Sequence, residues 1–145
     1  MYQHILICTD GSEVARKGVD HGLSLARVFG AKVTIVVVSE TIIPHADASE
    51  VGAFAHQDYS SMQKTAAEGV LAAAEQEAIG RGLEVETVWH ENASPAEAIV
   101  DTGKTRGCDL IVMSSHGRRG LRRLILGSVT NEVLVLSPIP VLVVR

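Results

Sequence analysis

The residues best suited to chemistry lie in one stretch, 113–130, which is rich in glycine and arginine. Gly117 and Gly127 would let backbone amides come close to a phosphate, because glycine has no side chain to hold a ligand away. Ser128 and Thr130 follow at the expected start of a helix, where free N–H groups and hydroxyls favour anions. The stretch therefore predicts a polyanion site. Turn glycines followed by an ordinary N-cap serine would give the same sequence, and that interpretation stays open.

The same stretch holds the densest positive charge of the chain, in the form of Arg118, Arg119, Arg122 and Arg123. Guanidinium groups pair well with phosphate oxygens and could clamp a triphosphate, although a charged loop in solvent explains them equally well. No aromatic side chains interleave with the arginines, and the whole chain has 13 basic against 17 acidic residues, a formal charge of −4. DNA or RNA binding is therefore not favoured.

Patterns for catalysis, for metal binding and for redox cofactors are missing from the sequence. There is no GxxxxGK[ST] loop for rapid phosphoryl transfer and no GxGxxG after the first apolar run. The six histidines show no HxxxH or HExxH spacing, and Cys8 and Cys108 form no CxxC pair. His116 has no serine, cysteine or acid at a spacing that defines a triad. We therefore predict no catalytic residue and no metal site.

Five short apolar runs alternate with longer segments of helical composition, which is the pattern of parallel βαβ units. The expected strands are 5–8, 33–38, 83–89, 110–113 and 141–144. Right-handed crossovers then give one α/β domain over residues 1–145, a doubly wound open sheet of five parallel strands with helices on both faces. The strand order that we predict for it is 3-2-1-4-5. Cys8 and Cys108 would lie about 13 Å apart, too far for a disulfide.

Capping residues mark where the helices begin. Asp10 is expected to cap the first helix, and Ser94-Pro95 is expected to open the third. An alanine-rich helix is expected over 59–79, and residues 42–60 before it are expected to form a connection that flanks the pocket.

The fold class also predicts where a ligand binds. Doubly wound sheets bind ligands outside the carboxyl ends of the strands, where the strand order reverses. Here that point lies between the first and fourth strands, which brings together Thr9-Asp10, Val38 and 113–117. Asp10 would serve equally well as a plain helix cap.

These residues resemble the nucleotide-binding branch of the universal stress protein family. The family pattern Gly-x2-Gly-x9-Gly-(Ser/Thr) is matched by Gly117, nine residues and Gly127-Ser128, whereas Ser114 replaces its first glycine. The resemblance covers the whole chain, with 5–12 and 138–144 as further matching segments. If the first position required a positive φ, Ser114 would cost about 1 kcal/mol and weaken binding several-fold. Its hydroxyl would otherwise replace a backbone contact to the ribose.

The resemblance implies an ATP site, with or without Mg²⁺. Thr9 and Asp10 would contact the adenine and ribose, and Val38 would line the adenine pocket. The phosphates would enter at Gly117 and bind at the start of the fourth helix. The implied nucleotide-binding residues are Thr9, Asp10, Val38, Met113, Ser114, Gly117, Gly127, Ser128, Val129 and Thr130.

The last apolar strand, 141–144, would leave a bare edge that needs covering or pairing. The resemblance implies antiparallel pairing of this strand across a homodimer two-fold axis. No apolar run approaches the roughly 20 residues that cross a bilayer, and no secretory signal precedes the first strand, so we expect a cytoplasmic protein without membrane contact.

We therefore predict a nucleotide-dependent stress-response switch or sensor, which is not an enzyme and whose protein partners the sequence does not name. Two alternatives remain. One is a dimeric interaction module of the same fold without nucleotide binding, which Ser114 favours. The other is a slow ATPase.

Overall fold

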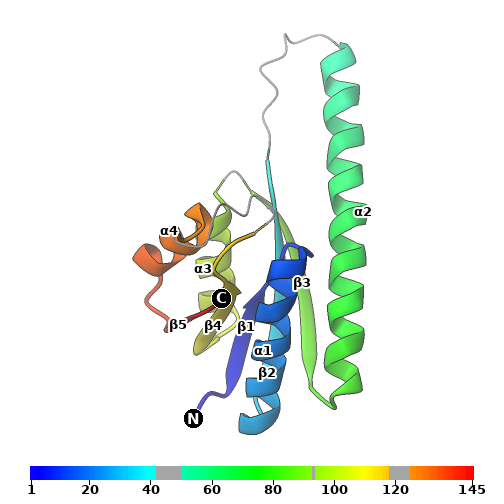
Figure 1. Cartoon of the computed structure of the whole chain (residues 1–145). Coiled ribbons are helices and arrows are strands. Elements are labelled where there is room, and N and C mark those ends of the chain that lie inside the picture. Colours follow the sequence, from blue (N-terminus) through cyan, green and yellow to red (C-terminus); the bar gives the residue numbers. More distant parts are fainter. Residues whose placement is uncertain (42–49, 93, 118–124) are drawn as a thin grey trace.

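The computed structural model describes residues 1–41, 50–92, 94–117 and 125–145, with the backbone alone at 50–56 and 92 (Figure 1). Strands and helices alternate along the chain. Their bounds are β1 His4–Cys8, α1 Glu13–Phe29, β2 Lys32–Glu40, α2 Glu50–Gly80, β3 Val85–Asn92, α3 Pro95–Thr105, β4 Leu110–Ser114, α4 Ser128–Leu136 and β5 Val141–Val144. The strands form one sheet in the order β3-β2-β1-β4-β5, and every neighbouring pair is parallel, which confirms the predicted topology.

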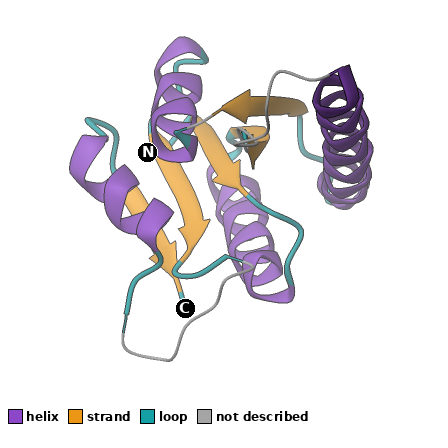
Figure 2. Ribbon diagram, turned by 90° about the horizontal axis from the view of Figure 1, so that it is seen from above, coloured by secondary structure: helices purple, strands orange, loops and turns teal. Residues whose placement is uncertain are grey.

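Helices cover both faces of the sheet (Figure 2). The alternation of side chains along β1 shows how the two layers are built: Ile5 and Ile7 pack with the layer of α1 and α2, whereas Leu6 and Cys8 pack with the layer of α3 and α4. All four side chains are buried, as expected for a central parallel strand. Both faces of β1 are thus used for packing, and only its ends are free to build a site.

The first helix begins later than its predicted cap. Ser12 is the N-cap, and its hydroxyl accepts a hydrogen bond from the N–H of Ala15 at 3.2 Å. Gly11, at φ 79°, turns the chain between Asp10 and the helix, so Asp10 lies outside the capping position. The Asp10 carboxylate accepts the N–H of Ser12 at 2.9 Å instead. The prediction that Asp10 caps α1 is therefore wrong, and its side chain belongs to the turn before the helix.

The second helix is longer than the sequence predicted. It begins at Glu50, so the prediction of a connection over 42–60 is wrong for residues 50–60, and residues 42–49 lie outside the described part of the chain. Gly52 suggested a loop, but one glycine in a helix costs only about 1 kcal/mol relative to alanine. Packing holds α2 on the sheet through Ala67, Leu71 and Ala78, and the amino-terminal part of α2 extends beyond the strands (Figure 1).

Two further expectations can be compared with the structure. Cys8 and Cys108, which were predicted to form no disulfide, are both free and buried. In the portion of the chain that the structure describes, no helix has both the length and the hydropathy to span a membrane.

Candidate functional site

A cavity of about 790 Å³ opens at the carboxyl ends of β1, β2 and β4, where the strand order reverses. The amino-terminal ends of α3 and α4 complete its walls. The structure brings all of the sequence-predicted site residues to this one cavity, namely Thr9, Asp10, Val38, Met113, Ser114, Gly117, Gly127, Ser128, Val129 and Thr130. Their individual roles toward a ligand stay predictions.

The turn after β1 and the loop after β4 meet at Asp10 and Gly117. A Cβ atom added to Gly117 would lie 2.6 Å from Oδ2 of Asp10, closer than Cβ atoms come to other atoms in proteins. Neither of these residues has a positive φ angle, so what Gly117 supplies here is space and not an unusual backbone conformation. Glycine at this position therefore lets the Asp10 carboxylate lie against the loop.

Gly127 has a similar structural reason to be glycine. Its N–H donates to the carbonyl of Ser115 at 2.8 Å, and an added Cβ would lie 3.1 Å from that oxygen and 3.5 Å from the Cα atom of His116. The start of α4 is thus packed directly on the chain that leaves β4. The Gly127 amide is used within the protein, and the anion donors of this helix must be the amides that follow it.

Ser114 is free of the backbone strain that a positive φ angle would impose on a serine in place of glycine. It is the last residue of β4, and none of the described residues other than glycine has a positive φ. Its hydroxyl donates to the carbonyl of His116 at 2.7 Å, and the hydroxyl of Thr130 donates to the carbonyl of Ser114 at 3.0 Å. These two hydrogen bonds hold the loop after β4 in place, and they occupy both hydroxyl groups within the protein.

Three backbone amides remain at the amino-terminal end of α4. The N–H of Asn131 is the first to bond within the helix, to the carbonyl of Gly127 at 2.9 Å, so the amides of Ser128, Val129 and Thr130 have no intrahelical acceptor. No side chain caps this end, and Ser128 itself is exposed. Free amides and the positive end of the helix dipole together make a place for an anion beside the cavity.

The described lining of the cavity is acidic. It contains Asp10, Glu40 and Glu132 and neither lysine nor arginine. The four arginines between 118 and 123 lie outside the described residues. Among the residues that the structure does describe, no group of three or more histidine, cysteine or acidic side chains suits a metal ion.

Several lining residues were missed by sequence reasoning. Ser94 and Pro95 line the cavity from the start of α3, and Glu40 does so from the end of β2, two residues beyond the predicted end of that strand. A signal for Ser94 was present, because in parallel βαβ units every helix starts at the carboxyl edge of the sheet. No comparable signal exists for Glu132, which lies one turn inside α4.

Cys8 also lines the cavity, but it is a poor nucleophile. Its burial, together with the nearby Cys108, raises its pKa far above the usual range of a thiol. Burial likewise raises the pKa of Cys108 to about 11. Both sulfur atoms are therefore protonated at neutral pH.

The chain is similar in sequence and in structure to known proteins. The sequence model of the universal stress protein family matches residues 1–145. The universal stress protein YxiE of Bacillus subtilis is 31% identical over 150 aligned residues, which cover all of both chains. The solved structure of MJ0577, a protein of Methanocaldococcus jannaschii, is similar with a TM-score of 0.84 at 29% identity, over 99% of this chain and 96% of the other.

Other solved structures with this fold contain adenine nucleotides. A universal stress protein of Archaeoglobus fulgidus in complex with dAMP has a TM-score of 0.71 at 20% identity, over 99% of this chain and 98% of that one. A universal stress protein in complex with cAMP has a TM-score of 0.69 at 24% identity, over 99% of this chain and 97% of that one. An Arabidopsis thaliana protein of the universal stress protein family with AMP bound has a TM-score of 0.69 at 16% identity, over 98% of this chain and 90% of that one. At these identities the likeness is one of fold.

Proposed function

Because this chain belongs to the universal stress protein family, we propose that it binds an adenine nucleotide in the cavity at the carboxyl ends of β1, β2 and β4. The observation that carries the proposal is the set of amides of Ser128, Val129 and Thr130 at the cavity wall, which have no acceptor among the described residues. Three N–H groups at a helix start form an anion site of the kind that binds phosphate. The phosphate end of the nucleotide thus faces α4.

The rest of the cavity suits a nucleoside. Val38, Met113 and Ile99 give apolar surface for the flat faces of a base, and Thr9, Asp10 and Ser94 supply polar groups for its edge and for the ribose. A cavity of about 790 Å³ falls in the size range of small-molecule sites. The dAMP, cAMP and AMP complexes of proteins with the same fold support an adenine base in particular.

We propose ATP as the physiological ligand, with Mg²⁺ entering only as a counter-ion of the triphosphate. The described lining holds no lysine or arginine, and the sequence carries positive charge suited to a triphosphate at Arg118, Arg119, Arg122 and Arg123, which lie outside the described residues. The sequence lacks the GxxxxGK[ST] loop of rapid phosphoryl transfer, and on this ground we propose that bound nucleotide acts as a signal in a stress-response switch and is not a substrate. Location in the cytoplasm is part of the same proposal.

We further propose a homodimer through β5. This strand is at one edge of the sheet, and Leu134, Val135 and Leu136 at the end of α4 expose 42%, 78% and 43% of their surface. The carbonyl of Val144 accepts the N–H of Ser115, so the backbone groups of Val144 face β4. Backbone groups alternate between the two sides of a strand, so the N–H of Val143 is directed away from β4.

The substitution Val143→Pro tests this interface, because it removes that outer N–H and leaves the hydrogen bonds between β4 and β5 in place. It is expected to give a monomer in analytical ultracentrifugation, and an unchanged dimer would place the interface elsewhere.

Binding is tested directly. Native mass spectrometry of freshly purified protein is expected to show retained adenine nucleotide, and isothermal titration is expected to give saturable heat with ATP. No heat up to millimolar ATP would contradict the proposal. It would favour the interaction module instead, a function consistent with the internal bonds that occupy the hydroxyls of Ser114 and Thr130 and the amide of Gly127.

A further inference from the structure

His116 has one ring nitrogen with a partner and one without. Nδ1 lies 3.0 Å from the hydroxyl oxygen of Ser115. Nε2 is shielded from water, with less than 1 Å² exposed, and has no hydrogen-bond partner. Leaving a buried polar nitrogen unpaired costs about 1–3 kcal/mol, so a group of this kind calls for a specific explanation.

The support of the ring is rigid. Ser115 is buried, its N–H donates to the carbonyl of Val144 at 2.8 Å, and its carbonyl accepts the N–H of Gly127 at 2.8 Å. The carbonyl of His116 is held in turn by the hydroxyl of Ser114 at 2.7 Å. The imidazole is therefore presented from a backbone that is fixed to β5 and to α4.

The ring belongs to the wall of the proposed nucleotide site, at its anionic end. His116 lines the cavity, and its Cα lies next to Gly127, the N-cap of α4. When the Ser115 hydroxyl donates to Nδ1, the proton of the neutral ring is on Nε2, which is then a donor. A phosphate held by the first-turn amides of α4 is an acceptor for that donor.

We propose that His116 is a phosphate-recognition residue, whose Nε2–H donates to a phosphate oxygen of the nucleotide. The inference rests on the proposed function and deepens it. The atoms that now shield Nε2 offer it no acceptor, so their exchange for a phosphate oxygen replaces an unmet hydrogen bond with one to a charged group. Within the described lining, His116 is the residue whose side chain carries a nitrogen donor, whereas Asp10, Glu40 and Glu132 carry carboxylates.

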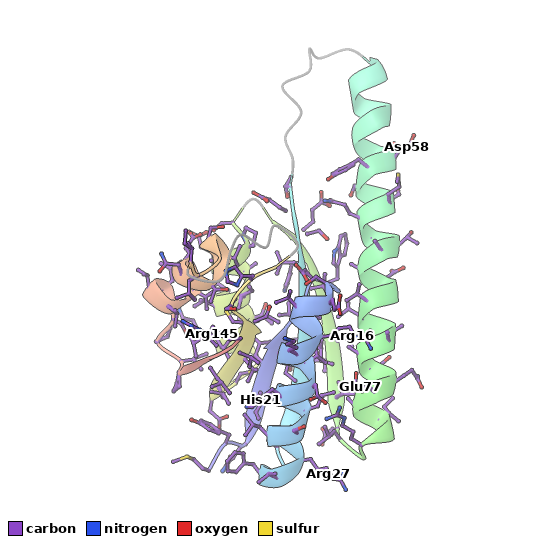
Figure 3. The ribbon with its side chains drawn as sticks, viewed as in Figure 1. Arg16, His21, Arg27, Asp58, Glu77 and Arg145 are labelled. Carbon is purple, nitrogen blue, oxygen red and sulfur yellow. The ribbon has the colours of Figure 1, made fainter. Side chains whose placement is uncertain are left out.

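Two substitutions separate the two ring nitrogens. His116→Asn keeps an amide nitrogen near the place of Nδ1 and has nothing at Nε2, whereas His116→Gln can reach the place of Nε2. His21, an exposed residue of α1 (Figure 3), provides the matched control His21→Asn. The probes are AMP and adenosine, measured by isothermal titration, because they share base and ribose and differ in the phosphate alone.

We expect His116→Asn to weaken AMP binding about ten-fold, as for the loss of one hydrogen bond to a charged group, and to leave adenosine binding unchanged. His116→Gln should recover part of the AMP affinity, and His21→Asn should match the wild type. Equal weakening of both ligands, or no change for either, would overturn the role of His116 while the proposed function stands. A wild-type protein that binds neither ligand would overturn both.

A second measurement needs no variant. In protein labelled with ¹⁵N-histidine, the Nε2 resonance of His116 is expected to move when AMP is added and to stay in place with adenosine. A resonance that does not respond to AMP, in protein shown by calorimetry to be saturated, would overturn the proposal.

Discussion

The two ends of the sheet differ in how far their polar groups are hydrogen-bonded within the protein. At the amino-terminal ends of the strands, the Asp109 carboxylate accepts the N–H groups of Gln3 and His4 at 2.8 and 3.1 Å, and Nε2 of His4 lies 2.8 Å from the hydroxyl of Thr34. At the carboxyl ends, Nε2 of His116 and the first amides of α4 have no such partners in the described chain. The polar groups named at the amino-terminal ends are thus bonded within the protein, whereas these donors at the carboxyl ends are not.

This difference follows from chain direction. In parallel βαβ units every helix starts at the carboxyl edge of the sheet, so the unpaired N–H groups of the first turns lie there. The carboxyl-terminal ends of the helices, with their unpaired carbonyl groups, lie at the amino edge. The unpaired N–H groups at the carboxyl edge therefore provide a site for an anion without any further change in the fold. Substitutions at the amino edge should therefore change stability and leave binding alone, and substitutions at the carboxyl edge should change binding first.

The largest effect is expected from Gly117→Val at the carboxyl edge. The new side chain meets Oδ2 of Asp10, 2.6 Å from the added Cβ, so the Asp10 carboxylate must leave its place beside the loop. Because Asp10 is a proposed contact to the ribose, its displacement is expected to lower adenine nucleotide affinity about ten-fold to hundred-fold in titration calorimetry, as for a lost hydrogen bond to a charged group. Gly69→Ala is the control, because a Cβ there meets nothing within 4 Å. Unchanged affinity in Gly117→Val would show that the loop is not part of the site.

At the amino edge, Asp109→Ala is expected to lower the free energy of unfolding by about 2 kcal/mol, because two backbone N–H groups lose a charged acceptor. Nucleotide affinity should not change. Urea unfolding and calorimetry on the same samples measure both quantities, with exposed Asp101→Ala as the control. A fall in affinity as large as the fall in stability would remove the distinction between the two edges.

Much of the fold could be predicted because its signals are local or periodic. Runs such as 110–113 and 141–144 are apolar enough to identify parallel strands, the first buried and the second partly buried at the sheet edge, and Pro95 placed the start of α3 to the residue. The start of α2 escaped because residues 50–60 combine a glycine with polar side chains and carry no decisive boundary signal.

The site residues could be brought together in advance, because topology alone sends them to one edge of the sheet. Their hydrogen bonds could not. Whether the hydroxyls of Ser114 and Thr130 face a ligand or a carbonyl depends on side-chain rotamers and loop packing that leave no trace in residue spacing. The same holds for His116, whose unpaired nitrogen is visible only once its neighbours are placed.

Thr130→Val sharpens the comparison within the carboxyl edge. Thr130 is buried and its hydroxyl supports the Ser114 carbonyl, so its loss should lower the free energy of unfolding by about 1 kcal/mol. Ser128→Ala, at an exposed position two residues earlier, should leave stability unchanged and weaken nucleotide binding a few-fold. If Thr130→Val reduced affinity far more than stability, its hydroxyl would be a ligand donor after all.

The last prediction concerns the buried thiol of Cys108, whose ionisation affects stability only at alkaline pH. Burial raises the pKa of Cys108 to about 11, whereas the unfolded chain ionises the same thiol near pH 9. Between these values the folded state holds the proton that the unfolded state has released, so stability falls as the pH rises from 9 to 11. Cys108→Ala is expected to be less stable at pH 7 because of the lost packing, and to show a shallower decline of stability over that range. Parallel declines in urea unfolding would mean that this thiol ionises as readily in the folded protein as in the unfolded chain.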